Sequence, residues 1–158
     1  MNLTVDRDTV ISRLLGANDI LILCHKNPDG DTIGSGTALC LALQRLGKTA
    51  SVLCSDPIPA MYSYMPIPLF DGSYTPAFVV AVDVAGIQLF GDRNHIQEYA
   101  EHVDLCIDHH GSNSGFALET LVEPEAAAAA ELLTSLIPAM GVELTPDIAA
   151  CLYTGLAT

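Results

Sequence analysis

Basic residues are scarce in this 158-residue chain. Lysine and arginine together number six, against nineteen aspartates and glutamates, which gives a formal net charge of -13. This balance disfavours a broad basic patch for gripping duplex DNA or an anionic membrane surface. An anionic substrate is still compatible with it, because bound cations reverse the local potential.

Paired cysteines, a leader segment and a membrane span are also missing. The five cysteines are scattered, odd in number and without a CxxC pair, which favours buried thiols in a reducing compartment over a disulfide framework. The N-terminal stretch MNLTVDRDTVISRLLG has acids and a helical period rather than the plan of a signal peptide. No apolar run approaches the roughly 20 residues of a membrane span. These features predict a cytoplasmic protein with no membrane partner.

What the chain does contain is an alternation of short apolar runs with helical patterns. Half of the residues are hydrophobic, and the length suits one domain. Apolar strands that alternate with helices predict an α/β fold with a mainly parallel sheet of about five strands and helices on both faces. The expected strands cover residues 19–24, 49–54, 77–83, 103–110 and 117–123. The expected helices cover 6–15, 31–47, 124–139 and 146–158, with a short one at 59–65.

Polar side chains stand at the ends of three expected strands. His25 follows the first strand, Asp83 ends the third, and the fourth ends in the run DHH at 108–110. The turn after the first strand adds Asp29 and Asp31. Ligands of parallel sheets bind outside the carboxyl ends of the strands. We therefore expect the three clusters to meet at one edge of the sheet.

These clusters combine four aspartates and three histidines, and Lys26 is the one basic residue inside the motifs. Carboxylates gathered without cations raise one another's pKa values, and divalent metal ions relieve that repulsion. Oxygen and imidazole ligands without thiolate favour Mn2+ or Mg2+, with zinc or iron as alternatives. Four acids exceed the usual need of one ion, which favours two ions about 3.5–4 Å apart, as in phosphoester hydrolysis.

Each motif, taken alone, is also compatible with a purely structural role. NPDGD is a good turn sequence, and Asp83 alone is compatible with a helix cap or a solvated strand end. Gly34 and Ser35 place small residues at a helix start, where a phosphate can approach backbone N–H groups. DHH at the end of a buried strand has little structural purpose. The coincidence of three clusters therefore favours function.

Other residues near the clusters are expected to be structural. Cys24 and Cys106 adjoin the clusters, but strand alternation points them into the core. His95 and His102 lie in a polar, helical stretch and are expected at the surface. The segment 62–65 is expected either to cover the site or to pack in the core.

The motifs resemble the DHH phosphoesterase family, which includes RecJ-like exonucleases, oligoribonuclease/pAp phosphatases of the nanoRNase type and family II inorganic pyrophosphatases. The resemblance covers nearly the whole chain. It is carried by HKNPDGDTIGS (25–35), VAVDVA (80–85), DHHGSNSGFA (108–117), EPEAAAAAELL (123–133) and LYTGLAT (152–158). The first and third segments are specific motifs, and they look closer to the nanoRNase–pAp-phosphatase branch than to the others.

The resemblance implies a ligand set for two ions. His25 and Asp29 are expected to bind one Mn2+, and Asp31 and His109 the other. Asp83 is expected to bridge both ions, and Mg2+ is an alternative metal.

The resemblance also implies roles in catalysis and substrate binding. Asp108 is expected to orient the site, and His110 to contact the substrate phosphate or assist the leaving group. Gly34, Ser35 and Asn113 are expected to bind substrate together with His110.

In the family, the YTGL segment leads to a further aspartate ligand, and a DHHA1-type domain closes over the cleft. Residues 1–158 are therefore expected to be a DHH catalytic domain truncated just before that ligand, without the substrate domain. The implied reaction is hydrolysis of short single-stranded oligoribonucleotides or 3'-phosphoadenosine 5'-phosphate (pAp) by metal-activated water. A family II-type inorganic pyrophosphatase and a catalytically incomplete metal- or nucleotide-binding fragment are alternatives, and a homodimer is compatible with the sequence.

Overall fold

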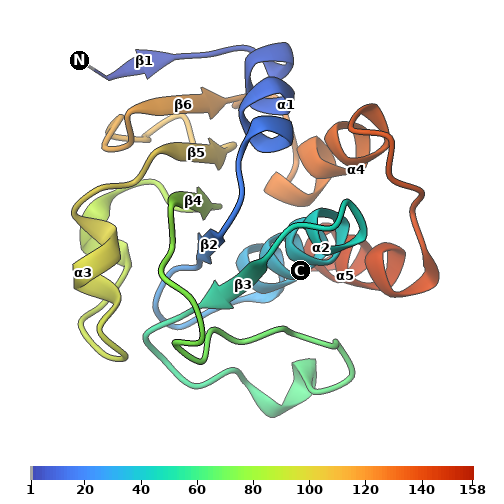
Figure 1. Cartoon of the computed structure of the whole chain (residues 1–158), viewed down its shortest axis with the longest axis horizontal. Helices are drawn as coiled ribbons and strands as arrows, with labels where there is room; N and C mark the ends of the chain where they lie inside the picture. Colours follow the sequence, from blue (N-terminus) through green and yellow to red (C-terminus); the bar gives the residue numbers. More distant parts are fainter. Residues whose placement is uncertain (1) are drawn as a thin grey trace.

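The computed structural model describes residues 2–158 and is built around a six-stranded, all-parallel sheet (Figure 1). The strands are β1 (Leu3–Thr4), β2 (Ile20–Leu23), β3 (Ala50–Leu53), β4 (Phe78–Val82), β5 (Leu105–Asp108) and β6 (Glu119–Val122). The α-helices are α1 (Arg7–Gly16), α2 (Gly30–Arg45), α3 (Ile96–Ala100), α4 (Ala129–Ala139) and α5 (Pro146–Ala157). Two short 3-10 helices, η1 (Ala60–Tyr62) and η2 (Ile87–Leu89), lie in the connections.

The order of the strands reverses at β2. The strand order in the sheet is β1-β6-β5-β4-β2-β3, so β3 and β4 lie on opposite sides of β2. The chain leaves β2 through α2 and leaves β4 toward α3, which lie on opposite sides of the sheet (Figure 1). Connections that diverge in this way open a crevice at the carboxyl ends of the two strands, where ligands bind in open α/β sheets.

Successive apolar side chains of a strand pack alternately into two hydrophobic cores, one on each face of the sheet. Ile20 and Ile22 of β2 lie in the core that α1, α2, α4 and α5 cover. Leu21 and Leu23 lie in the second core, which includes Ile96 of α3. A strand buried on both faces is apolar at every position, which is why ILIL has no polar residue. The expected α/β fold with helices on both faces is confirmed.

Two expectations differ from the structure. The sheet has a sixth strand because β1 pairs with β6 through Leu3 and Thr4, and two residues are too few to show a pattern. Helix α4 begins at Ala129 rather than near residue 124. Alanine favours a helix, but the preceding residues form turns, and the first N–H groups of α4 bind an aspartate on α2. Tertiary contacts therefore set this boundary.

Helices α2 and α5 pack closely because of a glycine at their contact. A Cβ added to Gly34 would lie 2.4 Å from the carbonyl oxygen of Cys151 and 3.1 Å from the backbone nitrogen of Gly155. Both neighbours are backbone atoms of a helix and cannot rotate away. The contact holds the end of α5 against the first turns of α2. None of the helices described in residues 2–158 has the length and apolar character needed to cross a membrane.

Gly34→Ala should therefore destabilise the protein. The added methyl group gains about 1 kcal/mol of helix propensity. The clash with α5 outweighs this gain, and we expect a net loss of about 1–2 kcal/mol in the free energy of unfolding, measured by urea titration. Gly16→Ala is the matched control, because a Cβ there meets nothing within 4 Å. Equal stability of the Gly34→Ala protein and the wild type would contradict the packing argument.

Candidate metal centre

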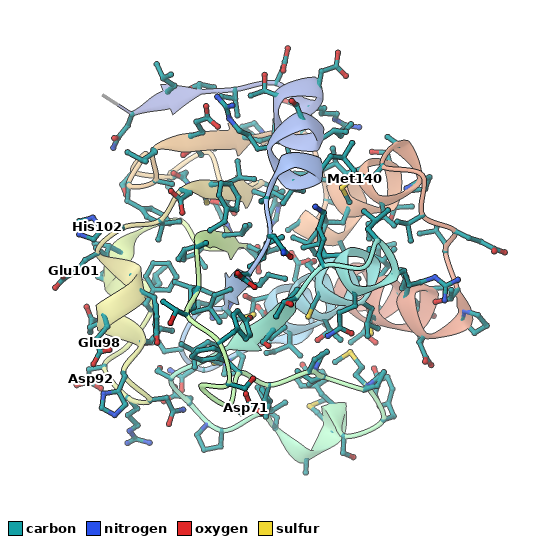
Figure 2. All side chains as sticks on the ribbon, viewed as in Figure 1. Asp71, Asp92, Glu98, Glu101, His102 and Met140 are labelled. Atoms are coloured by element: carbon teal, nitrogen blue, oxygen red, sulfur yellow. The ribbon has the colours of Figure 1, made fainter. Side chains whose placement is uncertain are left out.

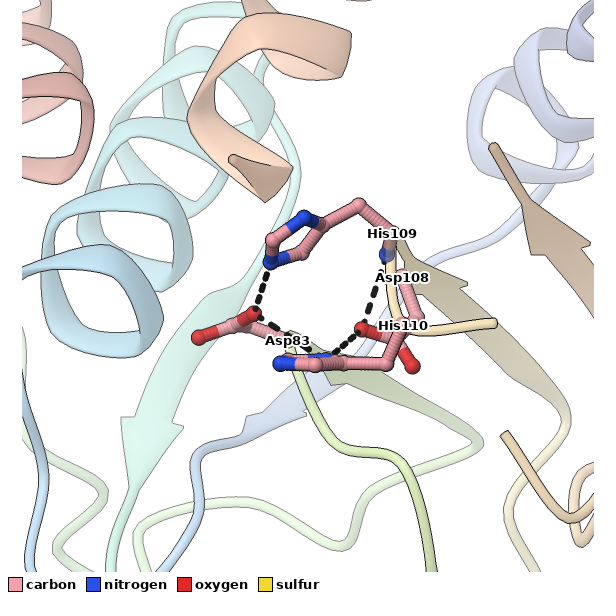
Figure 3. A group of neighbouring side chains, drawn as sticks. All are labelled: Asp83, Asp108, His109 and His110. Carbon is pink, nitrogen blue, oxygen red and sulfur yellow. Dashed lines mark hydrogen bonds and ion pairs between the residues drawn. The ribbon is translucent and has the colours of Figure 1, made fainter. Parts of the chain in front are cut away.

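The carboxyl ends of β2, β4 and β5 bring the three polar clusters to one rim. His25 lies two residues beyond β2, Asp83 follows β4 directly, and β5 ends at Asp108. Figure 3 shows Asp83 facing the run from Asp108 to His110 across the ends of neighbouring strands. The rim coincides with the reversal of strand order between β2 and β4.

The turn between β2 and α2 presents His25 and Asp29 together. Asp29 is the N-cap of α2, and its Oδ1 accepts a hydrogen bond of 3.1 Å from the backbone N–H of Thr32. The backbone N–H of Lys26 donates to the carbonyl oxygen of Leu89 over 2.7 Å, which fixes the turn against the η2 connection. His25 Nε2 lies 3.5 Å from Asp29 Oδ1. The capping geometry thus aims both side chains into the crevice.

Asp83 lies between two histidines. Its Oδ1 is 3.3 Å from His109 Nε2, and its Oδ2 is 3.8 Å from His25 Nε2. The residue is 3% exposed, and its Oδ1 is buried without a hydrogen-bond donor within the described residues. Its backbone has a positive φ of 62°, which an aspartate adopts more readily than most residues. The left-handed turn directs the carboxylate back over the end of the sheet.

The environment of Asp83 disfavours its ionised form. Burial, followed by the charges of Asp31, Asp29 and Asp108, raises the pKa of Asp83 to about 9. Burial lowers the pKa of His25, but its hydrogen bonds with Asp29 and Lys26 outweigh that effect and raise the pKa above its ordinary value. The hydrogen bond with His25 holds the pKa of Asp29 below its ordinary value. The site therefore contains more negative charge than its own side chains neutralise.

Asp31 is held by the start of another helix. Its Oδ2 accepts the N–H of Ala129 over 2.9 Å, and its Oδ1 accepts the N–H of Ala130 and the hydroxyl of Ser35, each over 3.0 Å. The Asp31 carboxylate thus takes the place of a capping side chain for the free N–H groups at the start of α4, since the N-cap of α4 is an alanine. His109 Nε2 lies 3.5 Å from Asp31 Oδ2. This contact joins α2, α4 and the end of β5 at one point.

Asp108 orients the residues that follow it. It is fully buried, and its Oδ1 accepts hydrogen bonds from the His109 backbone N–H over 2.8 Å and from His110 Nδ1 over 2.7 Å. Its Oδ2 accepts the side-chain amide of Asn113 over 2.8 Å. In Figure 3 the rings of His109 and His110 lie next to each other, with centroids 4.3 Å apart, and both face Asp83. The buried carboxylate therefore fixes His110 relative to Asp83.

The two histidines nearest the carboxylates have the arrangement of metal ligands. His25 Nδ1 lies 2.6 Å from the carbonyl oxygen of Lys26, and His109 Nδ1 lies 3.2 Å from that of Ala126. An Nδ1–H that donates to a carbonyl leaves the Nε2 lone pair free, and both Nε2 atoms face the acids.

Two groups of side chains have donor atoms close enough to share an ion. One consists of His25, Asp29 and Asp83, and the other of Asp83, Asp108, His109 and His110, with donor atoms within 4.8 Å of one another in each. Asp83 belongs to both groups. A buried carboxylate oxygen without a donor, with further carboxylates and imidazole nitrogens around it, fits divalent cations. The residues could thus hold two ions that share Asp83.

A cavity of about 640 Å³ opens above these groups. Six of the seven predicted acids and histidines line it, and Asp108 lies behind them. Gly34 and Ser35 are fully buried in α2, where Gly34 contacts α5 and Ser35 supports Asp31. The amide of Asn113 binds Asp108 and the carbonyl of Val84. The structure therefore does not bring Gly34, Ser35 or Asn113 to the cavity wall, and their contact with substrate stays a prediction that this arrangement does not favour.

Sequence reasoning missed part of the cavity wall. The end of α5, residues 155–158, lines the cavity together with Ala127 and Ala128. A Cβ on Gly155 would lie 2.6 Å from the Cβ of Ala130 and 3.2 Å from Asp31 Oδ1. The small residues of the alanine run and of the segment LYTGLAT are the sequence signal for this close approach.

The remaining predictions can be compared directly with the structure. Cys24 and Cys106 are fully buried, and burial raises the pKa of both thiols, so they belong to the core as expected. His102 projects from the outer end of α3 (Figure 2), and His95 is also exposed, as expected. In segment 62–65, Tyr62 and Met65 are buried in the core and Tyr64 is exposed. None of these residues lines the cavity.

Comparison with known proteins decides the family. The profile described as "DHH family, N-terminal domain" matches residues 19–156. The chain belongs to the DHH family. The match begins just before β2 and ends within α5, so it includes all three clusters of the DHH site.

Relatives of this DHH-family chain include proteins named for activity on nucleotides. It is 33% identical to the "Bifunctional oligoribonuclease and PAP phosphatase NrnA" of Thermus thermophilus, over 88% of this chain and 42% of the relative. It is 24% identical to the "Probable bifunctional oligoribonuclease and PAP phosphatase NrnA" of Streptococcus mutans, over 94% of this chain and 47% of the relative. The chain thus spans less than half the length of these relatives.

Solved structures share the fold. An exopolyphosphatase-related protein of Bacteroides fragilis superposes with a TM-score of 0.81 at 25% identity, covering 95% of this chain and 48% of that one. A Methanococcus jannaschii protein, assigned by name only to the family II inorganic pyrophosphatases, superposes with a TM-score of 0.54 at 19% identity, covering 86% of this chain and 47% of that one. The second comparison bears on the fold alone.

Asp83→Asn should stabilise the metal-free protein at pH 8. With a pKa of about 9 in the folded state, Asp83 keeps its proton, whereas the unfolded chain releases it above about pH 4. The wild type therefore loses stability as the pH rises from 5 to 8. Asparagine removes this titration and tolerates the positive φ. In urea titrations with a chelator, we compare the free energy of unfolding of the variant with that of the wild type. We expect the difference in favour of the variant to grow by at least about 1 kcal/mol from pH 5 to pH 8. A constant difference across that range would contradict the raised pKa.

Proposed function

We propose that this DHH-family chain carries the reaction centre of a metal-dependent phosphoesterase. Its proposed substrates are short oligoribonucleotides or pAp, with hydrolysis of a phosphodiester or phosphomonoester bond. The observation that supports it most is the pair of His/Asp groups that share Asp83, because two adjacent ions are the recurrent arrangement for phosphoryl transfer to water. The similarity to proteins named oligoribonuclease and PAP phosphatase supports the substrate class.

In this proposal, His25 and Asp29 would hold one ion, Asp31 and His109 would hold the other, and Asp83 would contribute to both. Mn2+ or Mg2+ suits the mixture of carboxylate and imidazole donors. The bound ions would supply positive charge to the phosphoryl oxygens and lower the pKa of water in the site. The positions of the ligand side chains would determine where the positive charge of the ions lies. Each of these side chains is held by a helix start, by a backbone carbonyl or by its place at the end of a strand.

His110 is proposed to act on the substrate directly. Its side chain is 43% exposed and lines the cavity, whereas its Nδ1 is held by Asp108. A buried carboxylate at Nδ1 keeps a proton on that nitrogen and fixes the orientation of the ring. The Nε2 side can then donate a proton to a phosphate oxygen or to the oxygen of the leaving group. Asp108 is a positioning residue in this scheme.

The charges around the cavity explain why cations are needed. Among the residues described as lining it there is no lysine or arginine. Asp29 and Asp31 make the wall negative, so a phosphate could not enter against them without bound metal. A cavity of about 640 Å³ has the volume typical of sites for small molecules and accommodates a short substrate rather than a duplex.

The first experiment measures hydrolysis of a 5'-labelled diribonucleotide, of pAp and of pyrophosphate, with Mn2+ and with a chelator. We expect the protein at its full encoded length to cleave the diribonucleotide or pAp only when metal is present. Asp83→Asn should reduce the rate by at least about 100-fold because both ions lose a shared ligand. Asp92→Asn, on an exposed loop, is the control with the same change of charge.

Each other outcome points to one of the alternatives. Release of phosphate from pyrophosphate far faster than from either nucleotide would favour the pyrophosphatase. Binding of Mn2+ by calorimetry without turnover of any of the three substrates would favour a metal-binding module. Equal rates for the wild type and Asp83→Asn would contradict the proposed centre.

Asp108→Asn tests the role of His110. The variant keeps the volume of the side chain but weakens the contact that orients His110, so we expect kcat to fall by about 10- to 100-fold while Mn2+ affinity is retained. His110→Gln should lower kcat to a similar degree. The double variant should lose little more than either single variant, because Asp108 acts through His110. Additive losses in kcat would contradict that coupling.

A further inference from the structure

Three of the six basic residues are already engaged elsewhere. Arg7 forms a two-point ion pair with Glu123, with both distances at 2.6 Å. Arg13 forms a similar pair with Glu119, at 2.8 and 2.7 Å. Lys48 Nζ donates to the carbonyl oxygens of Leu15 and Ala17 near the end of α1. These three cations stabilise the fold and cannot also bind a ligand without breaking those contacts.

Of the other three cations, Lys26 lies in the site turn, and Arg93 lies 4.0 Å from Asp56, whose carboxylate accepts a hydrogen bond from that turn. Arg45 ends α2, whose first turn contributes Asp31 to the site, so the helix separates Arg45 from Asp31 by about 21 Å. Lys26 belongs to the turn between His25 and Asp29 and is exposed. Arg93 lies in the connection after η2, with 71% of its side chain exposed. The positive charge available to a substrate is therefore concentrated on this side of the cavity.

A second cavity, of about 460 Å³, has Arg93 in its wall. Its other lining residues are Asn27, Pro28, Asp56, Pro57 and Pro59. Three prolines give it rigid apolar surfaces, and the arginine gives it a cation. A cavity of this composition suits the apolar face of a nucleoside together with an anionic group.

The guanidinium of Arg93 is only loosely engaged by the carboxylate beside it. Asp56 Oδ2 accepts the backbone N–H of Asn27 over 2.7 Å, whereas its Oδ1 lies 4.0 Å from Arg93 Nη1. That separation is too long for a hydrogen bond. Within residues 2–158, the side chain of Arg93 donates no hydrogen bond that meets ordinary geometric criteria, so its N–H groups are available for a phosphate. Asp56 limits the affinity for an anion but also keeps the guanidinium near the cavity.

The loop that carries Arg93 is fixed to the sheet and to the site turn. The side-chain amide of Asn94 donates to the carbonyl oxygens of Cys54 and Ser55, over 2.9 and 3.1 Å. Asn94 and Gly91 both have positive φ values, 57° and 81°, which shape the loop around the end of β3. The backbone of Arg93 is therefore placed before any ligand binds, which lowers the entropic cost of binding.

The two cavities share the turn from His25 to Asp29 as a wall. Asn27 and Pro28 line the second cavity, and His25 and Asp29 line the first. Asn27 is two residues from each of them, and two residues of extended chain span at most about 7 Å. The wall that separates the two cavities is therefore one short turn, and a ligand that carries two phosphates could bind on both sides of it.

We propose that the Arg93 cavity is a subsite for a second phosphate of the substrate, one nucleotide away from the phosphorus that reacts at the metal centre. This inference rests on the proposed function and specifies its substrate class as ribonucleotides that carry at least two phosphates. Arg93 binds the distal phosphate, and Pro28, Pro57 and Pro59 contact the nucleoside. Because the metal centre contains no arginine or lysine of its own, this contact supplies discrimination that the reaction centre lacks.

The test compares diadenylate with a 5'-phosphate (pApA) and without it (ApA). KM is measured for both substrates with the protein at its full encoded length, as the wild type, as Arg93→Gln and as Arg45→Gln, with Mn2+ present. We expect Arg93→Gln to raise the ratio of KM for pApA to KM for ApA about tenfold, the effect of losing one charge-assisted contact to a phosphate. Arg45→Gln removes the same charge and should leave the ratio at the wild-type value.

The outcomes separate the subsite from the proposed function. If both substrates are cleaved and Arg93→Gln leaves the ratio unchanged, or Arg45→Gln changes it equally, the subsite is wrong and the phosphoesterase stands. If the wild type cleaves neither of these substrates nor pAp, the proposed function fails. In that case no turnover occurs, and the Kd values of the same proteins for pApA and ApA can be measured by calorimetry. These values test the subsite. A tenfold weaker affinity of Arg93→Gln for pApA relative to ApA supports it, and an unchanged ratio of Kd values overturns it.

Discussion

The structure depends on one unfavourable placement, the burial of the Asp83 carboxylate between His25 and His109. Without a cation, desolvation and three neighbouring aspartates raise the pKa of this group to about 9. Such a group lowers the stability of the fold at neutral pH, so its presence needs a compensating ligand. A pair of divalent ions would reverse the sign of the local potential and turn the same cluster into a set of ligands.

Backbone N–H groups, rather than arginine or lysine side chains, stabilise the carboxylates of this site. The reversal of strand order between β2 and β4 opens the crevice, and the starts of α2 and α4 face it. Asp31 is solvated by N–H groups of α4, and Asp29 caps α2, so each acid is stabilised by a helix end. Because no basic side chain neutralises the acids directly, their oxygens stay accessible to cations. The few free cations, Arg93 among them, lie outside this ring, where they can act on the substrate.

Much of this arrangement was predictable from local patterns. The run ILIL required a strand buried on both faces, and an acid or histidine after each of three such strands required a shared rim by the rule for parallel sheets. The position of Ser35 was not predictable, because helical phase alone does not say that its hydroxyl supports Asp31 instead of a ligand. Nor was the start of α4, since the alanine run favours a helix throughout and only the contact with Asp31 selects Ala129. The Arg93 cavity joins segments around residues 27, 57 and 93, which no local pattern connects.

The account is tested most directly by a crystal structure of the protein grown with Mn2+, with data collected for the anomalous signal of manganese. The account predicts two peaks about 3.5–4 Å apart, one beside His25 and Asp29 and the other beside Asp31 and His109, with an oxygen of Asp83 in contact with both. A single ion that does not touch Asp83, or manganese bound only away from this rim, would contradict it.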